Sequence, residues 1–125
     1  MSDNELETPV VALPADLLFA SRIRAAAQAA GTTIDLVSTP TALHARTRRA
    51  LPRRVLIDLD ARGWDPVALI RELKQDAATS GIEIVAWVSH VREDAIGAAR
   101  EAGADRVLAR SAFTRQMQDW VTLQP

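Results

Sequence analysis

The stretch RVLIDLDARGWDPVALIRELK, residues 54–74, decides the fold class of this 125-residue chain. Residues 55–59 are apolar apart from Asp58, and such a short apolar run is typical of a strand buried on both faces of a sheet. Asp65 is a preferred N-cap residue and Pro66 fits the first turn of a helix, so a helix is predicted from Pro66 to about Ala78. The stretch therefore predicts a strand, a loop with two acids, and a helix.

The same alternation of a short apolar strand and a helix runs along the rest of the chain. Further strands are predicted at residues 10–13, 33–37, 82–88 and 106–109. Further helices are predicted at residues 16–30, 41–51 and 91–102, and a last helix is capped by Ser111 and turns Phe113, Met117 and Trp120 inward. Five strand–helix units in a row predict an α/β fold, in which a parallel sheet carries helices on both faces.

Composition narrows the classes of function. With 48% hydrophobic and 25% charged residues, the sequence predicts a flexible tail at residues 1–9 and one domain at residues 10–125, without an output domain. The absence of cysteine excludes disulfides and thiol chemistry, and two histidines, His44 and His90, leave little room for a histidine metal site. The net charge of -1 argues against a nucleic-acid partner, and no apolar run is long enough for a membrane span. The acidic N-terminus lacks a signal-peptide layout, so a cytoplasmic location is predicted.

Polar residues gather at the predicted carboxyl ends of the strands. They are Asp16 after the first strand, Asp58 and Asp60 at the third, Ser89 after the fourth and Arg110 after the fifth. In an open parallel sheet, ligands bind outside the carboxyl ends of the strands. The sequence therefore predicts one site at which carboxylates, a hydroxyl and a cation converge.

Two stretches carry a resemblance to the receiver domains of response regulators. VLIDLDARGWDPVALIRELK (residues 55–74) is similar to that family's third strand, phosphoacceptor loop and third helix. AREAGADRVLARSAF (residues 99–113) is similar to the family's A-x-x-A-G-A-x-x-Y-L-x-K-P-F end. The resemblance covers nearly the whole chain. It implies a flavodoxin-like, doubly wound sheet with strand order 2-1-3-4-5, and it places the phosphoacceptor at Asp58.

Departures from the family pattern fall on the parts that carry the phosphorylation switch. The acidic pair that holds Mg²⁺ in the family is replaced by Leu13-Pro14-Ala15, with only Asp16 nearby. The family's switch threonine corresponds to Val88 or Ser89 here, and its switch aromatic residue corresponds to Val107. The family's lysine and proline after the fifth strand correspond to Arg110 and Ser111. The two positions that usually hold Met-Pro after the acceptor are Ala61-Arg62. Mg²⁺ usually takes one or two carboxylate ligands, so we expect no cofactor beyond weak Mg²⁺ binding at Asp58.

The resemblance and these departures together imply a stand-alone pseudo-receiver. Such a protein would act in signal transduction through protein–protein interaction, would not be phosphorylated efficiently, and would not be an enzyme. An alternative is a genuine response regulator in which a histidine kinase phosphorylates Asp58. As a purely structural residue, Asp58 would instead pair with Arg110 or cap a backbone group, and Asp60 would bind its own backbone.

A second alternative is a haloacid-dehalogenase-like phosphohydrolase. In that family's motif the first aspartate, here Asp58, is the nucleophile and the second, here Asp60, is the general acid/base. Ser89 and Arg110 would supply the hydroxyl and the cation. Against this interpretation, that family carries the motif on its first strand and needs a further acidic pair, which this sequence lacks.

Surface residues supply the predicted contacts with signalling partners, whose identity the sequence does not give. The resemblance implies a pairing face built from helix 91–102, strand 106–109 and the last helix, and its mixed charges suit a homodimer. Those charged residues are Arg92, Glu93, Arg100, Glu101 and Arg106.

The remaining conspicuous residues have simple structural interpretations. A basic cluster consists of Arg46, Arg48, Arg49, Arg53 and Arg54. It could meet phosphates or an acidic partner, but a solvated helix end is the simpler interpretation. His90 is interpreted as a loop or cap residue near the site. Trp64 and Trp87 are interpreted as packing residues, and Trp64 would become an interface anchor only if it is exposed.

Overall fold

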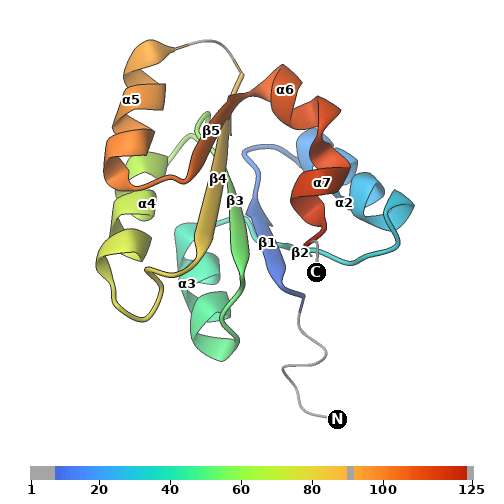
Figure 1. Cartoon of the computed structure of the whole chain (residues 1–125), viewed down its shortest axis with the longest axis horizontal. Helices are drawn as coiled ribbons and strands as arrows, with labels where there is room; N and C mark the ends of the chain where they lie inside the picture. Colours follow the sequence, from blue (N-terminus) through green and yellow to red (C-terminus); the bar gives the residue numbers. More distant parts are fainter. Residues whose placement is uncertain (1–7, 90–91, 124–125) are drawn as a thin grey trace.

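Five short strands pair in parallel and form one sheet in the computed structural model, which describes residues 8–89 and 92–123 (Figure 1). The strands are β1 (Val10–Leu13), β2 (Asp35–Leu36), β3 (Arg54–Asp58), β4 (Glu83–Val88) and β5 (Arg106–Ala109). Their order in the sheet is β2-β1-β3-β4-β5, so the predicted fold class and strand order are confirmed. β3 pairs with β1 on one side and with β4 on the other, so it is the central strand of the sheet. Asp58, its last residue, therefore lies in the middle of the edge formed by the carboxyl ends of the strands.

The helices begin and end at residues whose chemistry suits those positions. They are α2 (Leu17–Ala29), α3 (Pro40–Arg49), α4 (Pro66–Gln75), α5 (Glu93–Ala102), α6 (Arg110–Arg115) and α7 (Met117–Val121). The carboxylate of Asp65 accepts a hydrogen bond from the Ala68 N–H at 3.1 Å, so the predicted N-cap of α4 is confirmed. Gly103 ends α5 with a φ of 114°, a left-handed conformation that glycine adopts without steric cost.

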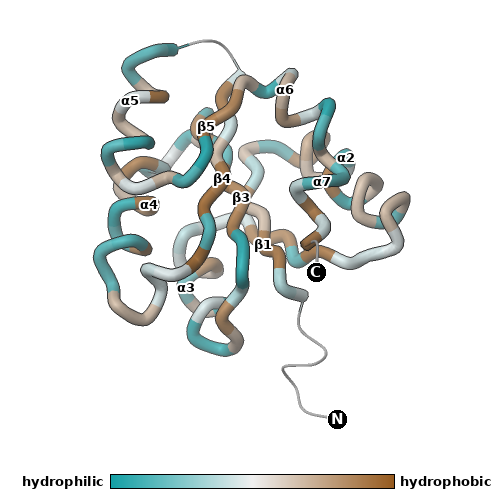
Figure 2. Tube along the Cα trace, in the orientation of Figure 1, coloured by the Kyte–Doolittle hydropathy of each residue, from teal (hydrophilic) through white to brown (hydrophobic). Residues whose placement is uncertain are grey.

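Helices cover both faces of the sheet and bury two apolar cores (Figure 1). One core lies under α3, α4 and α5, which contribute Leu43, Ile70 and Ala99 among others. The other lies under α2, α6 and α7, to which Phe19 and Met117 belong. Figure 2 shows the apolar residues concentrated along the strands between these layers. Burial on both faces explains why the strands read as continuous apolar runs.

Two predicted elements are markedly shorter in the structure, and several other ends shift by one or two residues. The strand predicted at residues 33–37 forms only Asp35–Leu36, because only these two residues pair with β1. The helix predicted to reach Ala78 ends at Gln75, because Asp76 is already extended, with φ -84° and ψ 122°.

The predicted last helix is two short helices with Gln116 between them. Ser111 makes no cap, because α6 already begins at Arg110 and has no side-chain cap. Phe113 and Met117 are buried as predicted, and Trp120 is half-buried against the same core. The Arg54 guanidinium donates hydrogen bonds to the carbonyls of Asp119, Trp120 and Thr122 at the C-terminal end of the second of these helices.

Thr8 and Pro9 belong to the folded part of the chain and not to a flexible tail. Thr8 is buried, and its hydroxyl donates to the Val10 carbonyl at 3.0 Å. The Pro9 carbonyl accepts from the Arg53 and Arg54 N–H groups at 2.8 and 3.2 Å. The prediction of a tail at residues 1–9 is therefore wrong for these two residues. The rest of that tail, together with His90 and the predicted helix start at residue 91, lies outside the described residues.

Candidate functional site

Asp58 lies at the carboxyl end of β3 and is almost completely enclosed. Only 1% of its surface is exposed. One carboxylate oxygen, Oδ2, accepts a hydrogen bond from the Ala15 N–H at 2.9 Å, and the other, Oδ1, accepts from the Asp60 N–H at 2.9 Å. Asp58 therefore caps backbone groups, as one of the structural interpretations predicted, and the loop after β1 closes over it.

Its surroundings shift the ionisation of Asp58 in favour of the protonated form. Burial is the largest influence and raises the pKa of the carboxyl above its ordinary value of 3.8. The hydrogen bonds from Ala15 and Asp60 lower the pKa, the nearby Asp60 charge raises it, and the Arg110 charge lowers it. The net effect is a raised pKa, so two backbone donors and one distant cation do not fully offset the loss of water.

Arg110 is directed to Asp16 and to an aromatic ring. Its Nη2 lies 3.5 Å from the Asp16 carboxylate, and its guanidinium carbon lies 4.0 Å from the centre of the Phe19 ring. The same Asp16 carboxylate caps α2 by accepting from the Phe19 N–H at 2.7 Å. The predicted Asp58–Arg110 pair is therefore wrong as a direct contact, because Asp16 and the ring hold the arginine.

Asp60 joins the loop after β3 to the loop after β4. Its Oδ2 accepts a hydrogen bond from the Ser89 N–H at 2.7 Å, and its Oδ1 lies 3.9 Å from Nη2 of Arg92. The prediction that Asp60 binds its own backbone is wrong, because its carboxylate accepts from the N–H of Ser89, the residue after β4. Ser89 takes part through its backbone N–H, and its side chain does not line the cavity described next.

A small open cavity of about 360 Å³ lies beside Asp58. It is lined by Ala15, Asp16, Asp58, Asp60, Arg62 and Arg110. Four of the five predicted site residues thus line one cavity. The fifth, Ser89, is connected to it by the hydrogen bond from its backbone N–H to Asp60. Sequence reasoning missed Arg62 as a lining residue, since the resemblance marked that position only as a departure. Among residues 8–89 and 92–123, no group of three or more acidic or histidine side chains is placed to hold a metal ion.

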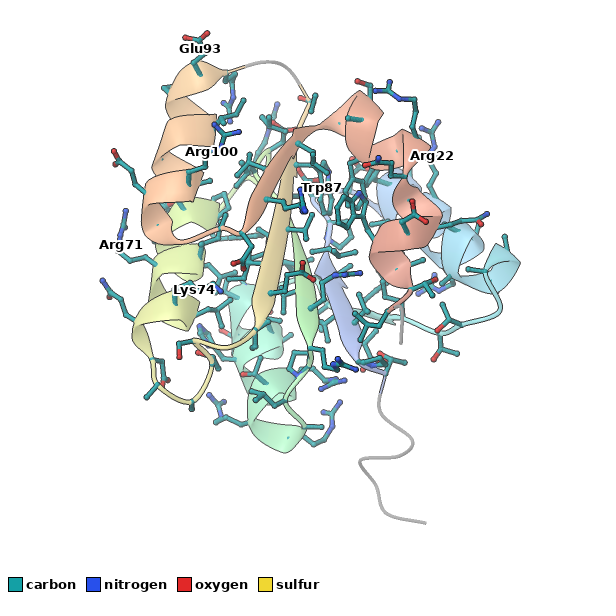
Figure 3. All side chains as sticks on the ribbon, in the orientation of Figure 1. Arg22, Arg71, Lys74, Trp87, Glu93 and Arg100 are labelled. Carbon is teal, nitrogen blue, oxygen red and sulfur yellow. The ribbon has the colours of Figure 1, made fainter. Side chains whose placement is uncertain are left out.

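An aromatic cluster lies in the core under α2, α6 and α7, and one of its rings, Phe19, contacts Arg110. The Trp87 ring is stacked on Phe113 at 4.4 Å between centres and lies 5.3 Å from Phe19. Trp87 is fully buried (Figure 3 labels it), and its indole N–H has no hydrogen-bond partner among the residues that the structure describes. Trp87 is therefore the core residue that the sequence predicted, whereas nothing in the sequence indicated the contact between Phe19 and Arg110. Trp64 is half-buried against the other core, so it is a packing residue.

The predicted pairing face is exposed and partly engaged. Glu93, Arg100 and Glu101 are exposed on α5 (Figure 3 labels the first two). Arg92 reaches Asp60, and Arg106 lies over the Trp120 ring at 5.9 Å. Two of the five charges are thus committed to contacts within the chain.

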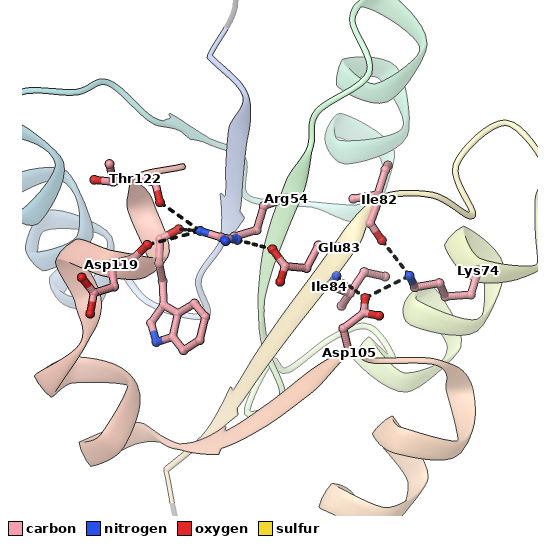
Figure 4. A network of polar contacts seen from close by, with 9 residues as sticks. Arg54, Lys74, Ile82, Glu83, Ile84, Asp105, Asp119 and Thr122 are labelled. Atoms are coloured by element: carbon pink, nitrogen blue, oxygen red, sulfur yellow. Dashed lines mark hydrogen bonds and ion pairs between the residues drawn. The ribbon is translucent and has the colours of Figure 1, made fainter. Parts of the chain in front are cut away.

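The basic cluster divides into two arginines that bind other parts of the fold and three that are exposed. Arg46 is only 2% exposed and binds Asp35 at 2.7 Å together with the carbonyls of Thr8 and Ala50. Arg54 binds Glu83 at 2.5 Å and three carbonyls at the C-terminal end of α7 (Figure 4). A solvated helix end is therefore the wrong interpretation for Arg46 and Arg54.

The other three arginines of the cluster, Arg48, Arg49 and Arg53, are exposed.

Within the described part of the chain, no helix is long and apolar enough to cross a membrane.

Comparison with known proteins establishes the fold. No protein-family model and no curated protein matches the sequence. Solved structures of response regulators match it in fold. A putative response regulator from Chloroflexus aurantiacus superposes with a TM-score of 0.79 at 19% identity, over 89% of this chain and 91% of that one.

Two further response regulators match over most of their length. The Mn²⁺-bound form of Rcp1 has a TM-score of 0.76 at 15% identity, over 93% of this chain and 96% of that one. The phosphorylated cyanobacterial phytochrome response regulator RcpA has a TM-score of 0.73 at 18% identity, over 92% and 89%. The chain therefore has the receiver-domain fold of CheY-like response regulators.

Proposed function

We propose that the protein is a cytoplasmic signalling module of the receiver type that acts through protein–protein contact and not through phosphorylation of Asp58. The likeness in fold to response regulators supports the receiver type. The enclosure of Asp58 carries the second part of the proposal, since both carboxylate oxygens already accept backbone hydrogen bonds and 1% of the residue is exposed.

Phosphoryl transfer to a carboxylate makes demands that this site meets poorly. One carboxylate oxygen must reach the phosphorus atom, and cations must neutralise the charge that develops on the phosphoryl oxygens. Mg²⁺ would need carboxylate ligands in a tight octahedron. Here the Ala15 N–H occupies the side of Asp58 at which the family's acidic pair would stand, and the cation Arg110 is held by Asp16. Burial also favours the protonated form of Asp58, which is the weaker nucleophile.

Intact mass before and after incubation with acetyl phosphate and Mg²⁺ tests this proposal. We expect no gain of mass under conditions that fully phosphorylate an active receiver domain run in parallel. Asp58→Asn is the control, because it removes the acceptor. A gain of one phosphoryl group that disappears in Asp58→Asn would overturn the proposal and establish a working response regulator.

The genuine phosphoacceptor remains the second candidate because a cavity opens beside Asp58. That cavity of about 360 Å³ is lined by Arg62 and Arg110, whose charges suit a phosphoryl group. The phosphohydrolase alternative has less support. Its general acid/base would be Asp60, and that carboxylate already binds the Ser89 N–H and lies near Arg92. Turnover of p-nitrophenyl phosphate that is lost in Asp60→Asn would favour it.

We also propose that the face of α5 and β5 pairs two copies of the chain. Arg100 and Glu101 are both exposed there, and opposite charges on one self-complementary face form reciprocal ion pairs in a two-fold dimer. Light scattering over a concentration series tests this. We expect a dimer that Glu101→Arg dissociates, and a monomer at every concentration would refute pairing through this face.

A further inference from the structure

A wide pocket, which we call the amino-edge pocket, lies at the amino ends of the strands, on the opposite edge of the sheet from Asp58. Its volume is about 720 Å³, against about 360 Å³ for the cavity beside Asp58. Four segments meet there: the loop after α3, the start of β3, the start of β4 and the end of α7. The lining residues are Leu51, Pro52, Arg53, Arg54, Gly81, Ile82, Glu83, Asp119, Trp120, Thr122 and Leu123. A pocket of this size with mixed apolar and polar walls is typical of small-molecule sites.

Apolar side chains form part of the wall of the amino-edge pocket. Leu51 is 57% exposed, and Trp120 and Leu123 are half-buried against the core under α2, α6 and α7. An exposed leucine beside a partly open tryptophan ring offers contact area to a flat apolar group. The wall is also open at Gly81, where an added Cβ would meet no atom within 4 Å. The pocket therefore has room for an aromatic ring.

Three polar groups of the lining can donate hydrogen bonds and have no acceptor. Arg54 binds Glu83 through Nε and three carbonyls through Nη1 (Figure 4), whereas its Nη2 makes no hydrogen bond within the described part of the chain. The indole N–H of Trp120 and the hydroxyl of Thr122 are buried and also have no partner among the described residues. Buried donors normally have acceptors, so this pocket lacks acceptor oxygens that a ligand would supply.

The charges of the lining have to be weighed by their contacts, because two arginines and two acids line the pocket. Glu83 is neutralised by Arg54, since their side chains lie 2.5 Å apart. Asp119 is exposed, and its carboxylate points away from Arg54 in Figure 4. Arg53 is exposed and makes no ion pair among residues 8–89 and 92–123. An oxyanion between Arg53 and Arg54 would therefore meet cations before it meets acids.

We propose that the amino-edge pocket binds a small aromatic carboxylate. The ring would lie against Leu51 and Trp120. The carboxylate would accept hydrogen bonds from Arg53 and from Nη2 of Arg54, because a guanidinium matches the two oxygens of a carboxylate. The pocket lies on the edge of the sheet opposite Asp58, so this inference does not depend on the function proposed above.

Nuclear magnetic resonance of the full chain tests the inference, with 2-naphthoate as the probe. We expect 2-naphthoate to shift the amides of residues 53–54 and 81–83 and the indole N–H of Trp120, which the variant Trp120→Phe assigns. Two matched probes are 2-naphthylmethylamine, which is a cation at neutral pH, and acetate, which has no ring. We expect the amine to bind at least about tenfold more weakly, and acetate to cause no shifts at the same concentration.

Substitutions at exposed positions separate binding from folding. Gly81→Leu should weaken 2-naphthoate about tenfold or more, because its side chain would occupy the open part of the wall. Arg53→Glu should have an effect of about the same size, because it reverses a charge at the carboxylate. The controls are Gly97→Leu, where an added Cβ also meets no atom within 4 Å, and Arg48→Glu, at an exposed residue that does not line the pocket. Both controls should leave the affinity unchanged, and urea unfolding checks that all four variants fold.

Several results would overturn the inference. Equal binding of the amine and the carboxylate would mean an apolar patch without selectivity for anions, and equal binding of acetate would mean an anion site without a place for a ring. Shifts confined to other residues, or no shifts at about 5 mM 2-naphthoate, would exclude this ligand class from the pocket.

A different occupant is excluded or established by a separate measurement. If Leu51→Ser dissociates a dimer in light scattering, the pocket is an interface between two copies of the chain and the inference is wrong. Phosphorylation of Asp58 in the mass experiment would overturn the proposed function and leave the 2-naphthoate result standing, so the two failures are distinguishable.

Discussion

The two edges of the sheet handle buried charge in opposite ways. At the carboxyl edge, Asp58 is buried with two backbone N–H donors and with Arg110 turned aside toward Asp16. At the amino edge, Arg46 is buried with a carboxylate and two carbonyls as direct partners. Arg54 there has a carboxylate and three carbonyls (Figure 4).

The difference indicates that the amino edge stabilises the fold and that the carboxyl edge is the place where binding can alter a buried charge. A buried charge surrounded by direct partners stabilises the structure only as long as every partner remains, so the amino edge is a structural tie. A buried carboxylate without a cation in direct contact is destabilised in its charged form, and its pKa rises, as at Asp58. Binding of a proton, a ligand or a partner at the carboxyl edge can therefore change how well the charge of Asp58 is stabilised.

The largest expected effect comes from breaking the amino edge. Arg46→Met removes a charge that is 2% exposed and leaves Asp35 and two carbonyls without their partner. We expect the free energy of unfolding to fall by about 3 kcal/mol. Urea unfolding followed by tryptophan fluorescence measures it. Arg48→Met, on the exposed side of the same helix, should cost less than about 0.5 kcal/mol, and equal losses in the two variants would refute the structural tie.

A middle-sized effect concerns the proton on Asp58. Since burial raises the pKa of Asp58 in the folded protein above its ordinary 3.8, the folded state binds this proton more tightly than the unfolded chain does. The contribution of Asp58 to stability is therefore fully present below pH 3.8 and is lost as the pH rises through the folded-state pKa.

The comparison between wild type and Asp58→Asn isolates this contribution. We expect the free energy of unfolding of the wild type to fall relative to that of Asp58→Asn as the pH is raised from about 4 to about 8. Urea unfolding of both proteins across this range measures the difference. A difference that is independent of pH would mean that Asp58 titrates alike in the folded and unfolded states.

The smallest expected effect on stability comes from Arg110→Met. The Asp16–Arg110 pair is half exposed, so its loss should cost less than about 1 kcal/mol. The pKa of Asp58 should nevertheless rise further, because the Arg110 charge lowers it. Carbon-13 NMR of the Asp58 carboxyl across a pH titration measures that change, and Arg115→Met on the same helix is the control. An unchanged pKa in Arg110→Met would show that the arginine does not reach the carboxylate electrostatically.

Sequence reasoning predicted the core strands well because burial on both faces leaves a direct trace in the residues. The run at residues 55–59 and the cap at Asp65 are local patterns, and both are confirmed apart from one residue at each end of the strand. The short length of β2 and the break at Gln116 were missed. β2 consists of the two residues that pair with β1, a contact between separate segments of the chain, and no local pattern marked the break at Gln116.

The candidate site shows the same division. The strand ends predicted that Asp16, Asp58, Asp60 and Arg110 would gather, and they line one cavity. Their pairing was not predictable. Asp58 accepts one of its two hydrogen bonds from Ala15, which lies 43 positions away, and Asp60 accepts one from Ser89, 29 positions away. The residue types show which groups can donate or accept hydrogen bonds. Which donor pairs with which acceptor depends on distances that only the folded structure gives.

By itself, the sequence determined that this protein is an alternating α/β chain with its acids and cations at one edge of a parallel sheet. Strand and helix periodicity, caps and turn residues act over a few positions, so they can be read from the chain directly. Only the tertiary structure decided that Asp58 is enclosed, that Arg46 is buried, and that Leu17 and Leu18 face solvent. Exposure and charge pairing depend on contacts between segments distant in the sequence, and folding alone sets those contacts.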